Sequence, residues 1–213
     1  EPFMSRSPPE PPEVVSLDTD YPIWDRFFTA APLVVVGTRE PSGEYDFAPK
    51  HMVTPLGWEN YFGFVCTPEH ATYQNIVRDE VFTVTFPTEE AVISTSLAAS
   101  PRCEDQSKPS LDALQTFAAT HVEGRFMSQG SLFFECRLDR IVDGFGGNSL
   151  FAGTIVAACA VPEAVRSVEV DDQDTWAASP VLVYISPRRY VSVNGSLSFP
   201  FPKGFRRTKD ERS

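Results

Sequence analysis

The most constraining feature of the sequence is a two-residue alternation of apolar and polar side chains across residues 131–139. The apolar positions are Leu132, Phe134, Cys136 and Leu138. Successive side chains of a β-strand point to opposite faces, so this period predicts a strand with one buried and one solvated face. A glycine-rich segment at 143–148 separates it from an apolar run at 150–160, which predicts a long antiparallel hairpin. Phe133 is an exception on the polar face and suggests contact with a partner protein.

The rest of the chain is also rich in strands. Strands are predicted at 32–38, 45–48, 61–66, 81–86 and 181–185, and helices at 71–78, 88–100 and 111–119. Strands that follow one another in hairpins favour a mainly β fold, an antiparallel barrel with short helices, over a doubly wound parallel sheet. The glycines at 144, 146 and 147 lie between two strands, so they predict a turn rather than a dinucleotide-binding loop.

Composition narrows the class of protein. The chain has 213 residues and a formal charge of −11. That length predicts one domain, and the negative charge argues against a nucleic-acid binder. No apolar stretch approaches the roughly 20 residues that span a bilayer, so we expect a cytoplasmic protein with no membrane partner. Cys66, Cys103, Cys136 and Cys159 form no CxxC pair, which favours free thiols in a reducing compartment over a metal site.

The two ends of the chain differ from its centre. Residues 1–20 are acidic and rich in proline, which predicts a disordered tail. Residues 21–197 are predicted as the folded domain. Residues 198–213 form an aromatic and basic extension, whose apolar first half we expect to cover the barrel, to reach across a dimer or to close over a ligand.

An abrupt strand-to-helix corner follows residue 66. Thr67 is predicted as the helix N-cap, Pro68 as its first residue and Glu69 as a partner of the helix dipole. This accounts for the corner without a ligand. The same helix terminus favours a bound phosphate, for which Thr67, His70 and Thr72 would supply donors. The residues alone leave both interpretations open.

Several stretches, taken in order, resemble the flavin reductase-like family, whose members bind FMN in a split, Greek-key-like antiparallel β-barrel. They are residues 47–55, the strand ending at 66–67, 72–76, 82–85, 131–138 and 150–153, and the similarity spans about residues 23–195. The resemblance implies cofactor contacts along the flavin ring from Ala48, Pro49, Lys50, His51, Met52, Val53 and Thr54. It implies contacts near the phosphate from Thr67, His70, Thr72 and Asn75, and Cys66 is a further candidate for cofactor binding.

The same resemblance implies an FMN-dependent oxidoreductase that takes NAD(P)H as reductant and forms a homodimer. FMN itself accepts the hydride, so no catalytic side chain is assigned. Two alternatives stay open. One is an FMN-binding electron carrier without turnover of its own, and the other is a split barrel that has lost flavin and binds another small ligand.

Overall fold

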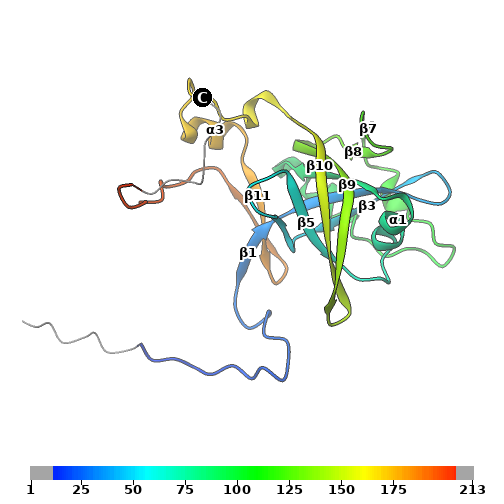
Figure 1. The fold of residues 1–213 in the computed structure, drawn as a ribbon, viewed down its shortest axis with the longest axis horizontal. Helices are drawn as coiled ribbons and strands as arrows, with labels where there is room; N and C mark the ends of the chain where they lie inside the picture. The colour runs from blue at the N-terminus through cyan, green and yellow to red at the C-terminus, as the bar shows by residue number, and fades with distance from the viewer. Residues whose placement is uncertain (1–11, 205–213) are drawn as a thin grey trace, which may run out of the picture.

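The computed structural model describes residues 12–204, so parts of both predicted end segments, 1–11 and 205–213, lie outside it. The described strands form three antiparallel sheets (Figure 1). The largest has seven strands in the order β3-β2-β6-β9-β10-β5-β4, the second is β1-β11-β12, and the third is the pair β7-β8. The predicted mainly β, antiparallel split-barrel fold is confirmed.

The elements follow one another along the chain with short connections. The strands are β1 Thr29–Pro32, β2 Val34–Arg39, β3 Tyr45–Lys50, β4 Val53–Pro55, β5 Tyr61–Cys66, β6 Val81–Pro87, β7 Thr116–Ala118, β8 Arg125–Met127, β9 Gly130–Phe145, β10 Asn148–Ala160, β11 Val181–Ser186 and β12 Arg189–Val193. The α-helices are α1 Ala71–Asp79, α2 Val92–Leu97 and α3 Asp172–Ala178. Three single-turn 3₁₀ helices are η1 Glu89–Ala91, η2 Pro109–Leu111 and η3 Pro162–Ala164.

The large sheet is curled because its two edge strands are neighbours in sequence. β3 and β4 lie at opposite edges of the sheet, yet only His51 and Met52 separate them. Consecutive Cα atoms are about 3.8 Å apart, so Lys50 and Val53 lie within about 11 Å of each other. The sheet therefore bends until its edges approach, and the backbone N–H of Val65 in β5 donates to the carbonyl of Met52 at 3.0 Å.

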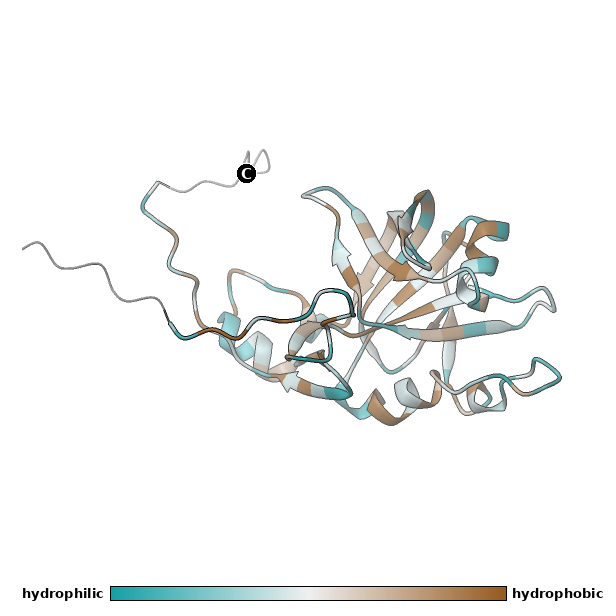
Figure 2. Cartoon of the chain, turned by 90° about the horizontal axis from the view of Figure 1, so that it is seen from below, coloured by the Kyte–Doolittle hydropathy of each residue, from teal (hydrophilic) through white to brown (hydrophobic). Residues whose placement is uncertain are grey.

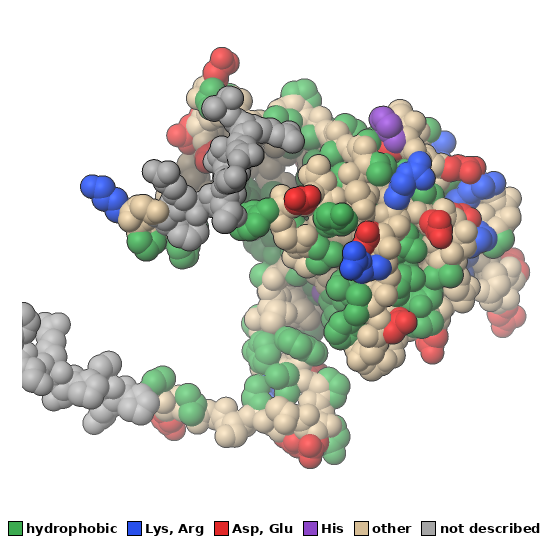
Figure 3. Space-filling model, in the orientation of Figure 1, with side chains coloured by type: hydrophobic (Ala, Val, Ile, Leu, Met, Phe, Trp, Pro, Cys, Tyr) green, Lys and Arg blue, Asp and Glu red, His purple; other side chains and the backbone are tan. Residues whose placement is uncertain are grey.

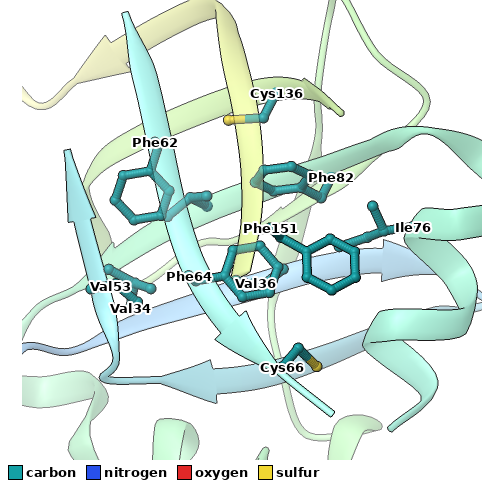
Figure 4. Close-up of a cluster of buried hydrophobic side chains, with 11 residues drawn as sticks. Val34, Val36, Val53, Phe62, Phe64, Cys66, Ile76, Phe82, Cys136 and Phe151 are labelled. Atoms are coloured by element: carbon teal, nitrogen blue, oxygen red, sulfur yellow. The ribbon is translucent and has the colours of Figure 1, made fainter. Parts of the chain in front are cut away.

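Aromatic rings fill the inside of the curled sheet (Figure 4). The Phe64 ring stacks on Phe151 with centroids 5.3 Å apart and meets Phe82 edge-on at 5.4 Å. Gly153 makes room for this packing, since a Cβ there would lie 2.5 Å from the Phe82 ring. Hydrophobic residues accordingly line the strands, while the loops are more hydrophilic (Figure 2).

Part of the outer face of β9 is covered rather than solvated, which corrects the prediction for residues 131–139, while Arg137 and Asp139 are exposed as predicted. Phe133 and Glu135 are both buried, at 6% and 5% exposure, beneath the β7–β8 hairpin. The Phe133 ring packs against Phe117 and Phe126 of that hairpin at 5.1 and 5.4 Å. Phe133 therefore has a partner within its own chain, and the inference of a protein contact at this residue was wrong.

The predicted helix at 111–119 is also absent, because the segment pairs with β8 instead. Only the single turn η2 is helical there, and β7 follows it. The Glu135 carboxylate accepts hydrogen bonds from the backbone N–H groups of Thr120, His121 and Val122 and from the Thr120 hydroxyl. These bonds hold the turn of the hairpin on β9, an interaction that local helix signals do not contain.

The remaining predicted elements are present with shifted ends. The helix predicted at 88–100 is η1 followed by the short α2, and β9 and β10 extend the predicted hairpin at both ends. The strand predicted at 181–185 is followed by β12, which the sequence analysis missed. β12 pairs back on β11 through a turn in which Arg188 has φ 61°.

We predict that Glu135→Gln destabilises the fold. Hydrogen bonds to a charged group contribute about 1.5–3 kcal/mol, and an amide would turn its NH₂ toward backbone donors. We expect a loss of about 2–3 kcal/mol in the free energy of unfolding at pH 7, measured by chemical denaturation. The exposed Glu163→Gln is the matched control and should change little.

This effect should depend on pH. Burial acts to raise the pKa of Glu135, but the backbone donors outweigh it and hold the pKa below the ordinary value of 4.5. A carboxyl group whose pKa is lowered by folding stabilises the fold at pH values above its ordinary pKa. That stabilisation is lost as pH falls through the lowered pKa. The difference between wild type and Glu135→Gln should therefore shrink below about pH 4.5, and an unchanged difference at pH 3.5 would contradict this assignment.

Candidate functional site

A cleft of about 310 Å³ lies where β3 meets the corner before α1. One wall is formed by Ala48, Pro49 and Lys50 of β3, and another by residues 69–72. The loop at 98–102, together with Lys108, closes the third side. Barrel closure explains the first two walls, because it brings the end of β3 next to the end of β5, from which the chain enters α1.

The corner differs from its predicted form. α1 begins at Ala71, and His70 occupies the N-cap position without a side-chain capping bond. The N–H of His70 donates to the carbonyl of Thr67 at 3.1 Å, so residues 67–70 form a turn. Proline favours the second position of such a turn, which explains why Pro68 precedes the helix rather than starting it. Thr67 is therefore not the N-cap.

This geometry leaves the start of α1 available to a ligand. The first N–H groups of an α-helix have no partner within the helix, and here no side chain caps them. Ala71 and Thr72 both line the cleft. The positive end of the dipole of a nine-residue helix therefore faces the cleft.

Lys50 supplies a buried positive charge to the same place. Lys50 is only 9% exposed, and its ammonium donates to the Cys66 thiol at 3.4 Å. Among residues 12–204 it forms no ion pair. An ammonium has three N–H donors, and burial of a charge is costly unless an opposite charge offsets it. Lys50 is therefore a candidate anchor for an anion in the cleft.

Two histidines near Lys50 are held in their neutral form. Burial, and then the charge of Lys50, lower the pKa of His51 and of His70 below the ordinary value of 6.5. His70 Nδ1 lies 3.9 Å from the Cys66 sulfur, and His70 lines the cleft. At neutral pH its ring therefore offers one donor and one acceptor.

The far wall carries charged residues that the sequence analysis missed. Lys108 Nζ lies 3.2 Å from Asp46 Oδ1 and 3.2 Å from the Phe47 carbonyl. Arg102 lies 3.3 Å from the same Asp46 oxygen and also pairs with Glu40. No local pattern connects these groups, since Asp46 and Lys108 are 62 residues apart. Three basic and two acidic side chains line the cleft, with Glu69 as the second acid.

The structure brings some of the predicted residues together and separates others. Ala48, Pro49, Lys50, His70 and Thr72 line the cleft, so Lys50 lies beside two of the residues that were predicted near the phosphate. Cys66 lies beneath it, at the end of β5 and close to α1 (Figure 4).

Asn75 has a different environment from the one predicted. Its amide donates to the Thr38 hydroxyl at 3.0 Å and accepts from Arg78 at 3.1 Å. The side chain is 2% exposed, so its polar atoms link α1 to β2.

The predicted ring-side residues continue from Lys50 across the closure of the barrel. The His51 ring lies against Tyr184 of β11, with centroids 4.4 Å apart. Met52 is 55% exposed, Val53 belongs to the barrel core, and the Thr54 hydroxyl donates to the Pro55 carbonyl. Tyr184 is thus a neighbour of the predicted ring side that no sequence signal indicated.

Comparison with known families identifies the class of this barrel. Residues 26–193 match the model of the flavin reductase like domain, and the chain belongs to that family. No curated protein matches the chain in sequence. Within residues 12–204, no helix is long and apolar enough to cross a membrane, and no group of three or more His, Cys, Asp or Glu could hold a metal ion.

Solved structures share the fold at low sequence identity. Nitrilotriacetate monooxygenase component B from Bacillus cereus is similar with a TM-score of 0.74 and 12% identity, over 88% of this chain and 100% of that one. Flavoredoxin of Desulfovibrio vulgaris has a TM-score of 0.72 and 16% identity, over 90% and 100%. The FMN-binding protein from Thermus thermophilus has 0.71 and 16%, over 88% and 99%.

We predict that the two histidines make stability pH-dependent. Because their pKa values are lowered in the fold, the unfolded chain binds protons that the folded chain does not. Stability is then complete above about pH 6.5 and falls as pH drops below it. The double variant His51→Phe, His70→Phe should have a shallower decline between pH 7.5 and 5.5 in thermal denaturation. Parallel curves for variant and wild type would contradict this prediction.

Proposed function

We propose that this chain is an FMN-binding oxidoreductase of the NAD(P)H-dependent flavin reductase type. The observation that carries the proposal is the buried ammonium of Lys50, which has no carboxylate partner among the described residues and faces a cleft at a helix N-terminus. Membership of the flavin reductase-like family supports a flavin as the ligand. The names of the similar structures include an FMN-binding protein and two flavoredoxins.

The residues present fit the phosphate of FMN. Lys50 would offer two free N–H donors, and the backbone N–H groups at Ala71 and Thr72 would add neutral donors along the dipole. His70 and the Thr72 hydroxyl complete the donor set, and Thr67 lies one turn away. Charge-assisted bonds of this kind are the strong ones. From this anchor, residues 51–54 lead along the barrel edge, where we place the flavin ring.

The side chains need only bind and orient the cofactor. When bound, FMN supplies the chemistry by accepting a hydride from NAD(P)H and passing its electrons on. Lys50 and the start of α1 fix the phosphate end, and the stacked pair His51 and Tyr184 borders the ring end. No side chain in this arrangement must act as a general base, so none is assigned.

We further propose a homodimer. The segment before β1 carries exposed aromatic side chains, with Tyr21, Trp24 and Phe28 at 72%, 60% and 68% exposure. Hydrophobic side chains gather visibly on this segment (Figure 3). Phe199, in the C-terminal segment, is 73% exposed. A second copy would remove this surface from water.

All four cysteines are free thiols, which supports a reducing, cytoplasmic environment.

We predict that Lys50→Met weakens FMN binding far more than riboflavin binding. Loss of a charged hydrogen bond costs about 1.5–3 kcal/mol, which corresponds to about 10- to 150-fold in affinity. Flavin fluorescence titrations would measure both ligands. The exposed Lys203→Met has the same change in charge and should bind like wild type. Equal FMN affinity in the two variants would place the phosphate elsewhere.

Reduction of the bound flavin separates the proposed enzyme from its alternatives. We expect that NADH or NADPH, added in the absence of oxygen, bleaches the absorbance of the bound flavin. The rate of bleaching should be at least as fast as catalytic turnover. A yellow protein that neither nucleotide bleaches would be an electron carrier without this reductase activity. A chain that binds no FMN at all would be a barrel that takes another ligand.

A further inference from the structure

The loop between α2 and η2, residues 99–108, has open space on both of its sides. On one side, residues 99–101 line the cleft. On the other side, residues 105–107 line a second hollow, a groove of about 810 Å³. Arg102 and Lys108 line both hollows. The loop therefore separates the cleft from the groove, and it can shift toward either without displacing close-packed core side chains.

Apolar contacts hold the two ends of this loop, whereas charged groups hold its middle. Ala98, just before it, belongs to the buried cluster around Phe47, and Leu111, shortly after it, packs against the same cluster. Within residues 12–204, the hydrogen bonds and ion pairs that link the loop to the β2–β3 hairpin all come from Arg102 and Lys108. The position of the loop beside the cleft thus depends on these two side chains.

The two basic side chains are held unequally at Asp46. Lys108 is the more buried, with a side chain 9% exposed, and it donates to Asp46 Oδ1 and to the Phe47 carbonyl. The Arg102 side chain is 26% exposed, lies 3.3 Å from the same Asp46 oxygen and is shared with Glu40. Asp46 has a side chain only 4% exposed, so it needs a cation beside it. Lys108 supplies that cation, and Arg102 can therefore leave without isolating a buried charge.

Arg102 also has the chemistry that a phosphate group requires. Its guanidinium carries five N–H donors in a planar fork, which can bind two phosphate oxygens at once. A carboxylate has a single charge, whereas a phosphate monoester carries about −1.5 to −2 charges at pH 7. A phosphate group beside Lys50 in the cleft would thus compete with Asp46 and Glu40 for Arg102.

We propose that Arg102 is a mobile anion-binding residue, which leaves Asp46 and Glu40 for a phosphate group in the cleft and moves the 99–108 loop with it. The proposal goes beyond the proposed function, because it concerns any ligand that carries a phosphate group. The acidic partners compete with that ligand, so their pairing with Arg102 in the free chain lowers its affinity. Glu40 therefore helps to set the affinity of the cleft, although it lines only the groove.

A fluorophore on Cys103 tests whether the loop moves. Cys103 is an exposed thiol within the loop, and Cys159→Ser removes the other exposed thiol. Inorganic phosphate is the probe, titrated against chloride at constant ionic strength, so the test requires no flavin. We expect a saturable change in the fluorescence of the label, and no change when Arg102→Gln is added.

The affinity for inorganic phosphate tests the competition. Thermal denaturation measures this affinity, because a ligand that binds only the folded chain raises its stability according to concentration and Kd. Arg102→Gln should weaken phosphate binding about tenfold, whereas Glu40→Gln should tighten it about threefold. A merely structural ion pair would give changes of the same sign, because either substitution breaks it.

Glu44→Gln is the matched control for Glu40→Gln. Glu44 is exposed, lines the same groove and has no ion pair within residues 12–204. Its substitution removes the same charge, and it should leave the affinity for phosphate within about 1.5-fold. An equal gain in affinity from both glutamine variants would show that net charge, rather than release of Arg102, is responsible.

The possible failures are distinct. Affinity changes of the same sign for Arg102→Gln and Glu40→Gln would overturn the role of Arg102. So would a silent label while phosphate stabilises the chain, or no stabilisation by phosphate at all. Flavin titrations would still decide the proposed function in each case. A chain whose label responds to phosphate but which binds no FMN would retain this role for Arg102 and contradict the proposed function.

Discussion

The two-residue link between opposite edges of the large sheet is the constraint from which the site follows. His51 and Met52 join β3 to β4, and this link is too short to connect the two edges of a flat sheet. Closure places the end of β3 beside the end of β5, where Met52 bonds to Val65. Lys50 then lies against Cys66, and the chain leaves β5 through the corner that starts α1. Closure of the barrel therefore also brings together the segments that line the cleft.

The positively charged side chains that line the cleft differ in how their charges are balanced. Arg102 and Lys108 are balanced by Asp46 and Glu40, so they hold the loop at 98–108 on the strand. Within residues 12–204, Lys50 is balanced by nothing stronger than the Cys66 thiol. Paired charges fix structure, whereas a buried unpaired charge leaves a free-energy cost that an anion can relieve. This contrast distinguishes the residue that would anchor a phosphate from those that shape its surroundings in the free chain.

Structures with 12–16% identity share this fold over most of their length. Such conservation of shape depends on pattern rather than on particular side chains. In this chain the barrel is built from strands with apolar faces, close ring packing against Gly153 and a short edge-to-edge link. Structures at this level of identity share the fold alone, so ligand preference requires measurement on this chain.

Local sequence predicted the long strands of the large sheet and the helix at 71–78, because side-chain period and turn residues act over a few neighbours. The split-barrel family followed from a resemblance carried by several stretches taken in order. The resemblance also implied Lys50, His70 and Thr72 as site residues, and the structure places all three at one cleft. Local sequence misplaced the N-cap at Thr67, made Phe133 and Glu135 solvent-facing, and predicted a helix where β7 lies. The errors at β7 and β9 concern residues whose partners lie elsewhere in the chain, whereas at Thr67 a local turn to His70 replaces the predicted cap. Only the tertiary structure decided that the β7–β8 hairpin covers β9, that Asn75 bonds to Thr38, and that Lys108 meets Asp46. Hydrogen bonds and ion pairs across such separations depend on where the closed barrel brings the chain together, and no local pattern encodes that.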